Sequence, residues 1–135
     1  MLSNKQKYYL LISALEGGSN YWYFLGDLSM IPEKGYSPKS KEMKEELEKN
    51  DQGMIDCLVN RVWEAVQNGA EVPVFDAEDP EEKLGVISKK SMANAVKLMI
   101  KDYPNHLGDV LTEQDDAETG DVFLQLAVMG DIVFG

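Results

Sequence analysis

Residues 54–66 constrain the fold more than any other stretch, because their apolar side chains recur at helical spacing. One stripe carries Ile55, Leu58, Val59, Val62, Trp63 and Val66. The same spacing places Asn60 and Glu64 off that stripe. The stretch therefore predicts an amphipathic helix that packs one face on a core and ends at Asn68-Gly69.

Weaker helical spacing and capping signals predict the remaining helices. They are expected at residues 5–15, 21–28, 40–49 and 89–101, and from Thr112 or Asp115 to Val128. Residues 32–51 hold little apolar content and a run of lysine and glutamate. This part of the chain is expected to form a surface excursion from the core.

Two short apolar runs, at residues 72–75 and 84–87, predict strands joined by a polar loop, and residues 132–134 predict a terminal strand. Pro73 cannot donate to a ladder, so its strand should lie at a sheet edge. The pattern predicts one α+β domain over residues 1–135. It should have four or five helices and a small two- or three-stranded antiparallel sheet.

The residue types exclude several classes of chemistry. One cysteine, Cys57, allows no intrachain disulfide, and one histidine, His106, allows no two-histidine metal site. The glycine motifs of nucleoside triphosphatases and dinucleotide-binding folds do not occur. The sequence therefore predicts a protein that is not an enzyme and needs no cofactor. Short apolar runs and the lack of a signal-peptide pattern predict a cytoplasmic protein.

Acidic residues dominate the charge. The chain has 13 lysines and arginines against 24 aspartates and glutamates, a net charge of −11, which disfavours binding to nucleic acids or anionic membranes. Residues 102–135 contain no lysine or arginine. Their acids either form a solvated surface or face a basic partner, with Asp115, Asp116 and Glu118 as the expected contacts. Glu118 and Asp121 also share a helix face, which leaves a divalent cation as an alternative.

The densest cluster of unusual residues lies near the start of the chain. Gly17 and Gly18 permit close backbone approach, and Asn20 supplies a donor and an acceptor. Four aromatic residues follow, beginning with Tyr21 and Trp22, and one helix cannot direct all four into a core. The cluster predicts either a corner for a planar, anionic ligand held by the first turn of the next helix, or plain core packing.

Two segments resemble those of small, mostly uncharacterised proteins of bacteriophages and prophages. They are residues 14–22 and 120–135, about 25 of the 135 residues. In that group alanine commonly stands where this chain has Gly120, so the last helix is expected to begin or bend there. The resemblance implies a phage accessory protein in the cytoplasm of an infected bacterium. Such small acidic proteins often look like inhibitors of host functions, including antiviral defence.

These observations predict a non-enzymatic binding protein that blocks a host protein or captures a small nucleotide-like ligand. The expected site joins the corner at residues 17–22 to Asp121 and Gln125 of the last helix. Three alternatives stay open. They are an acidic decoy that mimics nucleic acid through residues 102–135, a metal-dependent hydrolase, and a virion or assembly protein that forms homo-oligomers through residues 132–134.

Overall fold

The computed structural model describes residues 2–111 and 116–135. These residues form seven α-helices and a three-stranded antiparallel sheet, so the predicted α+β class is confirmed, whereas four or five helices is too few. The helices are α1 (Asn4–Ser13), α2 (Lys41–Glu48), α3 (Gln52–Asp56), α4 (Leu58–Gln67), α5 (Lys89–Asp102), α6 (Pro104–Leu111) and α7 (Ala117–Met129). The strands are β1 (Tyr23–Phe24), β2 (Val72–Asp76) and β3 (Lys83–Ile87). A π-helical turn, η1 (Ala14–Gly18), continues α1.

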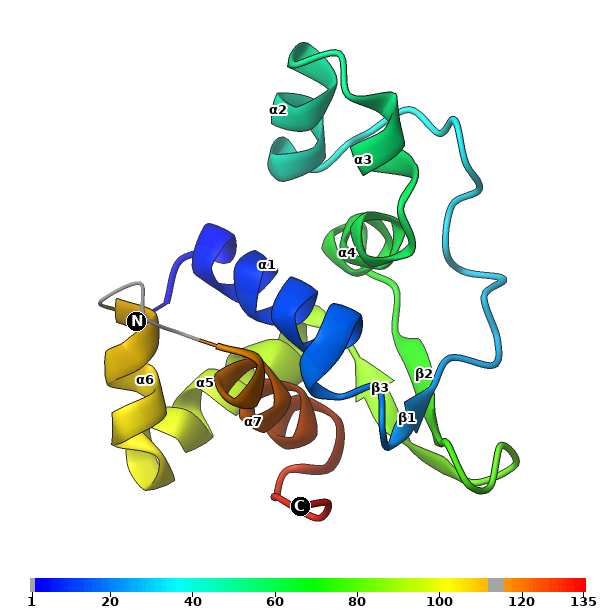
Figure 1. Ribbon diagram of the computed structural model, residues 1–135. Coiled ribbons are helices and arrows are strands. Elements are labelled where there is room, and N and C mark those ends of the chain that lie inside the picture. The colour runs from blue at the N-terminus through cyan, green and yellow to red at the C-terminus, as the bar shows by residue number, and fades with distance from the viewer. Residues whose placement is uncertain (1, 112–115) are drawn as a thin grey trace.

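Helix α7 is the central element, packed against α1, η1, α5 and β3 (Figure 1). Its side chains are buried nearly all round, as expected for a helix in the middle of a core. Two glycines set the approach of its neighbours. A Cβ on Gly120 would lie 2.8 Å from the Ala14 nitrogen, and one on Gly85 would lie 2.0 Å from the Val128 carbonyl oxygen. Helix α7 begins three residues before Gly120. The missing side chain at Gly120 allows η1 to lie close to α7.

The helix predicted at residues 21–28 is wrong. The chain instead turns after η1 and forms β1, in which Tyr23 and Phe24 pair with β2. The reason lies far away in the sequence. The Ser19 hydroxyl, a natural N-cap, donates to the Asp121 carboxylate instead, and so does the Trp22 indole. These bonds hold the segment in a turn.

The helix predicted at residues 54–66 is broken into α3 and α4. Five of the six residues of its predicted apolar stripe are buried, whereas Leu58 is exposed. Cys57 has an extended backbone between them, with φ −66° and ψ 151°. The Arg61 side chain donates to the Asp56 carbonyl and the Asn60 amide donates to the Met54 carbonyl, which caps the end of α3. Asn60 and Glu64 are buried although they lie off the apolar stripe, so α4 is buried on more than one face.

Helices α2 and α3 lie above α4 in Figure 1, on the side away from α5, α6 and α7. Helix α2 confirms the helix predicted at residues 40–49, and the Ser40 hydroxyl caps it by accepting from the Met43 backbone. The Met43 side chain is fully buried. The Trp63 indole donates to a Glu42 carboxylate oxygen over 2.9 Å, which ties α2 to α4.

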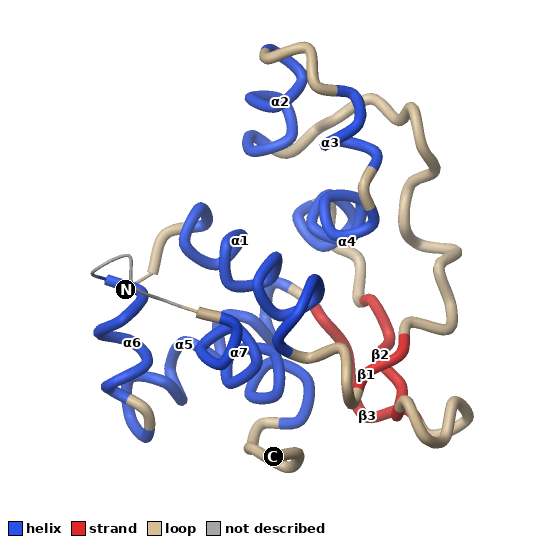
Figure 2. The backbone as a smooth tube through the Cα atoms, in the orientation of Figure 1, coloured by secondary structure: helices blue, strands red, loops and turns tan. Residues whose placement is uncertain are grey.

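The sheet has the order β1, β2, β3 and lies to one side of the helices (Figure 2). The two predicted strands are confirmed as β2 and β3, but the expectation that Pro73 marks an edge strand is wrong, because β2 is central. Strand β1 is only two residues long and pairs with Phe75 and Asp76. Pro73 faces Val86 of β3 and lies beyond the end of β1, so its missing N–H breaks no ladder.

The helix predicted at residues 89–101 is confirmed as α5, with Ser88 as its N-cap. Pro104 begins α6, a helix that the sequence analysis did not predict, and His106 lies on it. Gly130 ends α7 with a positive φ of 75°, as its position predicts. Thr112 and Asp115, the two residues at which α7 was predicted to begin, lie outside the described residues. Within the described chain, no helix has the length and apolar character needed to span a bilayer.

Candidate functional site

The Asp121 carboxylate brings the two distinctive segments together. Its Oδ1 accepts from the Ser19 hydroxyl and the Trp22 indole, each over 2.7 Å. Its Oδ2 accepts from the Tyr21 hydroxyl over 2.7 Å and from the Gln125 amide over 3.1 Å. These five residues are called the Asp121 clasp below. A carboxylate offers about four acceptor positions, so all of them are used.

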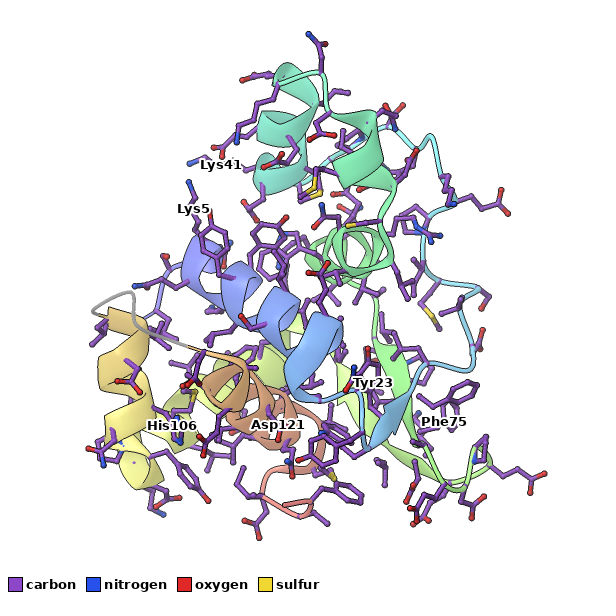
Figure 3. All side chains as sticks on the ribbon, viewed as in Figure 1. Lys5, Tyr23, Lys41, Phe75, His106 and Asp121 are labelled. Atoms are coloured by element: carbon purple, nitrogen blue, oxygen red, sulfur yellow. The ribbon has the colours of Figure 1, made fainter. Side chains whose placement is uncertain are left out.

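Local backbone structure positions each member of the clasp. Asp121, which is labelled in Figure 3, and Gln125 stand four residues apart on α7 and therefore lie on one face of the helix. The Ser19 N–H donates to the Ala14 carbonyl at the end of η1, and the Trp22 N–H donates to the Ser19 carbonyl. This turn directs the side chains of Ser19 and Trp22 toward α7.

Gln125 also holds the last residues of the chain. Its Oε1 accepts from the backbone N–H groups of Val133 and Phe134, and its Nε2 donates to the Phe134 carbonyl, each over 2.9 Å. The Phe134 ring stacks on Trp22 with centroids 5.4 Å apart and an interplanar angle of 10°. The strand predicted at residues 132–134 is therefore wrong, because a glutamine side chain takes the place of a neighbouring strand.

The two aromatic residues of the clasp differ in exposure. Trp22 is 2% exposed and belongs to the core, whereas Tyr21 is 52% exposed. Desolvation raises the pKa of the Tyr21 hydroxyl to about 12, and its hydrogen bond to the negative Asp121 carboxylate adds to the shift. Tyr21 therefore stays neutral and remains a donor to Asp121 at physiological pH.

A pocket of about 570 Å³ opens beside the clasp. Its lining consists of Tyr21, Glu118, Asp121, Val122, Gln125, Ile132, Phe134 and Gly135. The described lining thus combines two carboxylates with two aromatic rings and contains no lysine or arginine. Its size is within the usual range of ligand sites. The charge of this pocket suits a cationic group and repels a phosphate.

The predicted corner at residues 17–22 is only partly assembled into this site. Gly17 and Gly18 lie in η1, and Asn20 is exposed; neither Gly17 nor Asn20 lines the pocket. The expected phosphate position at the start of a second helix is wrong, because no helix follows the glycines. The N–H groups of Ser19 and Trp22 already donate within the turn.

The three acidic residues that were predicted to contact a basic partner differ in their surroundings. Asp115 lies outside the described residues. Asp116 is the N-cap of α7, and the hydrogen bond from the Thr119 backbone lowers the pKa of its carboxyl group. Glu118 is exposed and lines the pocket. In the part of the chain that the structure describes, no three histidine, cysteine or acidic residues are grouped closely enough to bind a metal ion.

Sequence reasoning did not single out Ser19 within the corner at residues 17–22, and it left Phe134 out of the site. Serine is a common N-cap residue, and the position of Ser19 after two glycines is also typical of the start of a helix. Phe134 stands among apolar residues that are typical of a strand. The available signal was that both residues lie inside the two distinctive segments at residues 14–22 and 120–135.

The comparisons with known proteins add no relative. The chain matches no family model, no curated protein and no solved structure.

Proposed function

We propose that this chain is a non-enzymatic binding protein that holds a basic segment of a protein partner in the pocket beside the Asp121 clasp. The observation that carries the proposal is the lining of this pocket. Glu118 and Asp121 supply negative charge, while Tyr21 and Phe134 supply aromatic rings. This combination is suited to the side chain of an arginine or lysine.

An arginine fits the lining best. Its flat guanidinium group can donate two hydrogen bonds to one carboxylate and stack on an aromatic face. Glu118 is the exposed carboxylate and would accept those bonds. The four donors on Asp121 are neutral, so this carboxylate adds negative charge to the pocket without itself being displaced from the clasp.

The surrounding charge favours the same partner. Residues 102–135 contain acidic side chains and no lysine or arginine. A surface of one sign attracts a partner of the opposite sign and speeds the encounter. A small nucleotide-like ligand is less favoured, because its phosphate would meet Glu118 and Asp121.

The resemblance to phage proteins supplies a context for this binding. In that context the partner is a host protein, and the chain acts in the cytoplasm of an infected bacterium. Occupying a basic surface of the partner would block whatever acidic molecule that surface normally binds. Inhibition of a host function such as antiviral defence follows from binding alone and needs no catalytic step.

Calorimetric titration with a short peptide of alternating arginine and glycine tests the proposal. The wild type should bind the peptide, and Glu118→Gln should bind about fivefold more weakly, the equivalent of about 1 kcal/mol. Glu81→Gln is the matched control, because Glu81 is an exposed glutamate in the loop between β2 and β3. Equal weakening by both substitutions would point to general acidity and would contradict a specific pocket.

A further inference from the structure

A second pocket lies between helix α4 and the loop that joins β1 to α2 (Figure 1). Its volume is about 520 Å³, and it shares no lining residue with the pocket beside the Asp121 clasp. The apolar part of its lining includes Met30, Ile31 and Ala65. The polar part includes Tyr36, Lys39, Glu64 and Asn68. The pocket therefore places a carboxylate and a phenol beside an apolar wall.

The Glu64 carboxylate is buried without a cation bonded to it. Glu64 is 1% exposed, and it forms no ion pair with any described residue. Its carboxylate accepts from the backbone N–H groups of Lys39 and Ser40 and from the Asn68 side-chain amide, which are all neutral donors. A carboxylate offers about four acceptor positions, so one is left. A buried charge of this kind is costly unless an opposite charge pairs with it.

The Tyr36 hydroxyl is a buried polar group without a partner. Its oxygen is shielded from water, and no side chain or backbone group of the described residues forms a hydrogen bond with it. Desolvation and the negative charge of Glu64 raise the pKa of this hydroxyl above its ordinary value. The hydroxyl therefore stays protonated and lies within the influence of the Glu64 carboxylate. A buried hydroxyl normally forms a hydrogen bond, because leaving that bond unmade costs stability.

We infer that this pocket binds the primary ammonium group of a small amine with an apolar body. An ammonium group carries a positive charge and three N–H donors. One N–H would bond to the remaining acceptor position of Glu64 and another to the Tyr36 hydroxyl oxygen, and the charge would balance the buried carboxylate. Met30 and Ile31 would contact the apolar body of the ligand. This inference is independent of the proposed function.

Lys39 supplies the positive charge in the lining of this pocket. Its side chain is exposed, so water and salt screen its charge. Glu64 is buried, and a charge acts more strongly where the dielectric constant is lower. The carboxylate therefore has the larger effect on a charged group at the inner end of the pocket, and this effect favours a cation.

Nuclear magnetic resonance titration with isopentylamine tests the inference. The side-chain amide signals of Asn68 should shift in a saturable way, because this amide lines the pocket and donates to Glu64. Isopentyl alcohol lacks the charge, and isopentyltrimethylammonium has the charge but no N–H donor. Both should bind at least about tenfold more weakly than the amine. Equal binding of the trimethylated ion would indicate general charge attraction and would overturn the inference, as would the absence of a saturable shift.

Tyr36→Phe is the sharpest variant, because it removes only the hydroxyl that has no partner. Binding of isopentylamine should weaken about fivefold, while the free energy of unfolding in urea should equal or exceed that of the wild type. Tyr23→Phe is the matched control. The Tyr23 hydroxyl donates to the Leu15 carbonyl over 2.8 Å, and Tyr23, labelled in Figure 3, does not line the pocket. This control should lose stability and keep binding. Unchanged binding by Tyr36→Phe would overturn the inference.

Charge variants test the sign of the ligand. Glu64→Gln should lose binding of isopentylamine, whereas Glu71→Gln should keep it, because Glu71 is exposed and does not line the pocket. Should Glu64→Gln fail to fold, Tyr36→Phe decides. Lys39→Gln keeps the backbone N–H that donates to Glu64 and removes a like charge, so binding should stay equal or become tighter. A marked loss of binding by Lys39→Gln would contradict an amine ligand.

A last titration identifies the source of the ammonium group. A short glycine peptide with one central lysine presents the same group on a protein chain. A free amine is the assigned ligand, so the peptide should bind no more tightly than isopentylamine. Clearly tighter binding of the peptide, lost in Tyr36→Phe, would overturn the assignment to a small molecule and identify a protein partner instead.

Discussion

The two buried tryptophans differ in what surrounds the carboxylate that each one contacts. Trp22 donates to Asp121 over 2.7 Å, and Trp63 donates to Glu42 over 2.9 Å. Asp121 accepts from three further side chains and borders a pocket. Among the described residues, Trp63 is the one side chain that donates to Glu42. A tryptophan and carboxylate pair therefore belongs to a hub of four hydrogen-bond donors at Asp121, whereas it forms a single link at Glu42.

This difference shows that the role of a tryptophan and carboxylate pair depends on the donors that tertiary structure adds. Ser19 and Tyr21 reach Asp121 across about a hundred residues of sequence. Their bonds join the turn after η1, helix α7 and the tail into one unit. Glu42 joins α2 to α4 across 21 residues. Of these two carboxylates, Asp121 combines structural support with charge at a surface pocket.

The largest expected difference between the two regions comes from neutralising each carboxylate. Asp121→Asn replaces an acceptor of two hydrogen bonds by an amide donor, which should lower the free energy of unfolding by about 2 kcal/mol. Glu42→Gln keeps a carbonyl oxygen for the Trp63 indole and should cost about 0.5 kcal/mol. Urea unfolding of both variants measures the difference. Equal losses would mean that Asp121 is no more of a hub than Glu42.

The next largest effect concerns the close approach that allows the clasp to form. Gly120→Ala would place a Cβ 2.8 Å from both the Ala14 nitrogen and the Ser13 Cβ. This overlap should cost about 2 kcal/mol, more than the helix-forming advantage of alanine returns. Gly108→Ala on α6 is the control, because a Cβ there meets nothing within 4 Å. It should stabilise the protein by up to about 1 kcal/mol. A stable Gly120→Ala variant would show that η1 moves freely against α7.

Sequence patterns predicted those parts of the fold that local residues determine. The cap Ser88 marks α5 because a cap acts within its own helical turn. The helix predicted at residues 21–28 failed because Ser19 and Trp22 bind a distant carboxylate. The break at Cys57 depends on side chains from the next helix. Such contacts have no signal in local spacing.

The candidate site was predicted in part for the same reason. Tyr21, Asp121 and Gln125 were assigned to one site, and the structure brings them together. The sequence could not show that their polar groups bond mainly to one another. It also could not show that the tail closes over Trp22 through Phe134. These contacts change a site expected for an anion into a pocket suited to a cation.

A smaller effect is expected at the start of α7, which sets the position of Asp121. Asp116→Ala removes the side chain that caps the Thr119 N–H and should cost about 1 kcal/mol. Folding lowers the pKa of Asp116, so its stabilising effect is present above its ordinary pKa and is lost as the pH falls through the lowered value. Urea unfolding at neutral and acidic pH should show the variant and the wild type converging in acid. A constant difference would contradict the capping role.

The smallest effect concerns the exposed member of the clasp. The pKa of Tyr21 is raised from 10.0 to about 12, so its contribution to stability is complete below pH 10 and is lost as the pH rises through about 12. Nuclear magnetic resonance of the Tyr21 ring should show this midpoint. In Asp121→Asn the midpoint should fall toward 10.0, because the negative charge is removed. An unchanged midpoint would mean that Asp121 does not influence the titration of Tyr21, which would contradict this part of the account.

The two indole N–H signals provide the most direct test of the central claim, that the hub rather than the single link borders the binding surface. Trp22 and Trp63 are the two tryptophans of the chain, so each signal reports on one region. On titration with the arginine and glycine peptide, the Trp22 indole signal should shift in a saturable way while the Trp63 signal stays in place. A saturable shift of Trp63 alone, equal shifts of both signals or no shift of either would contradict the account.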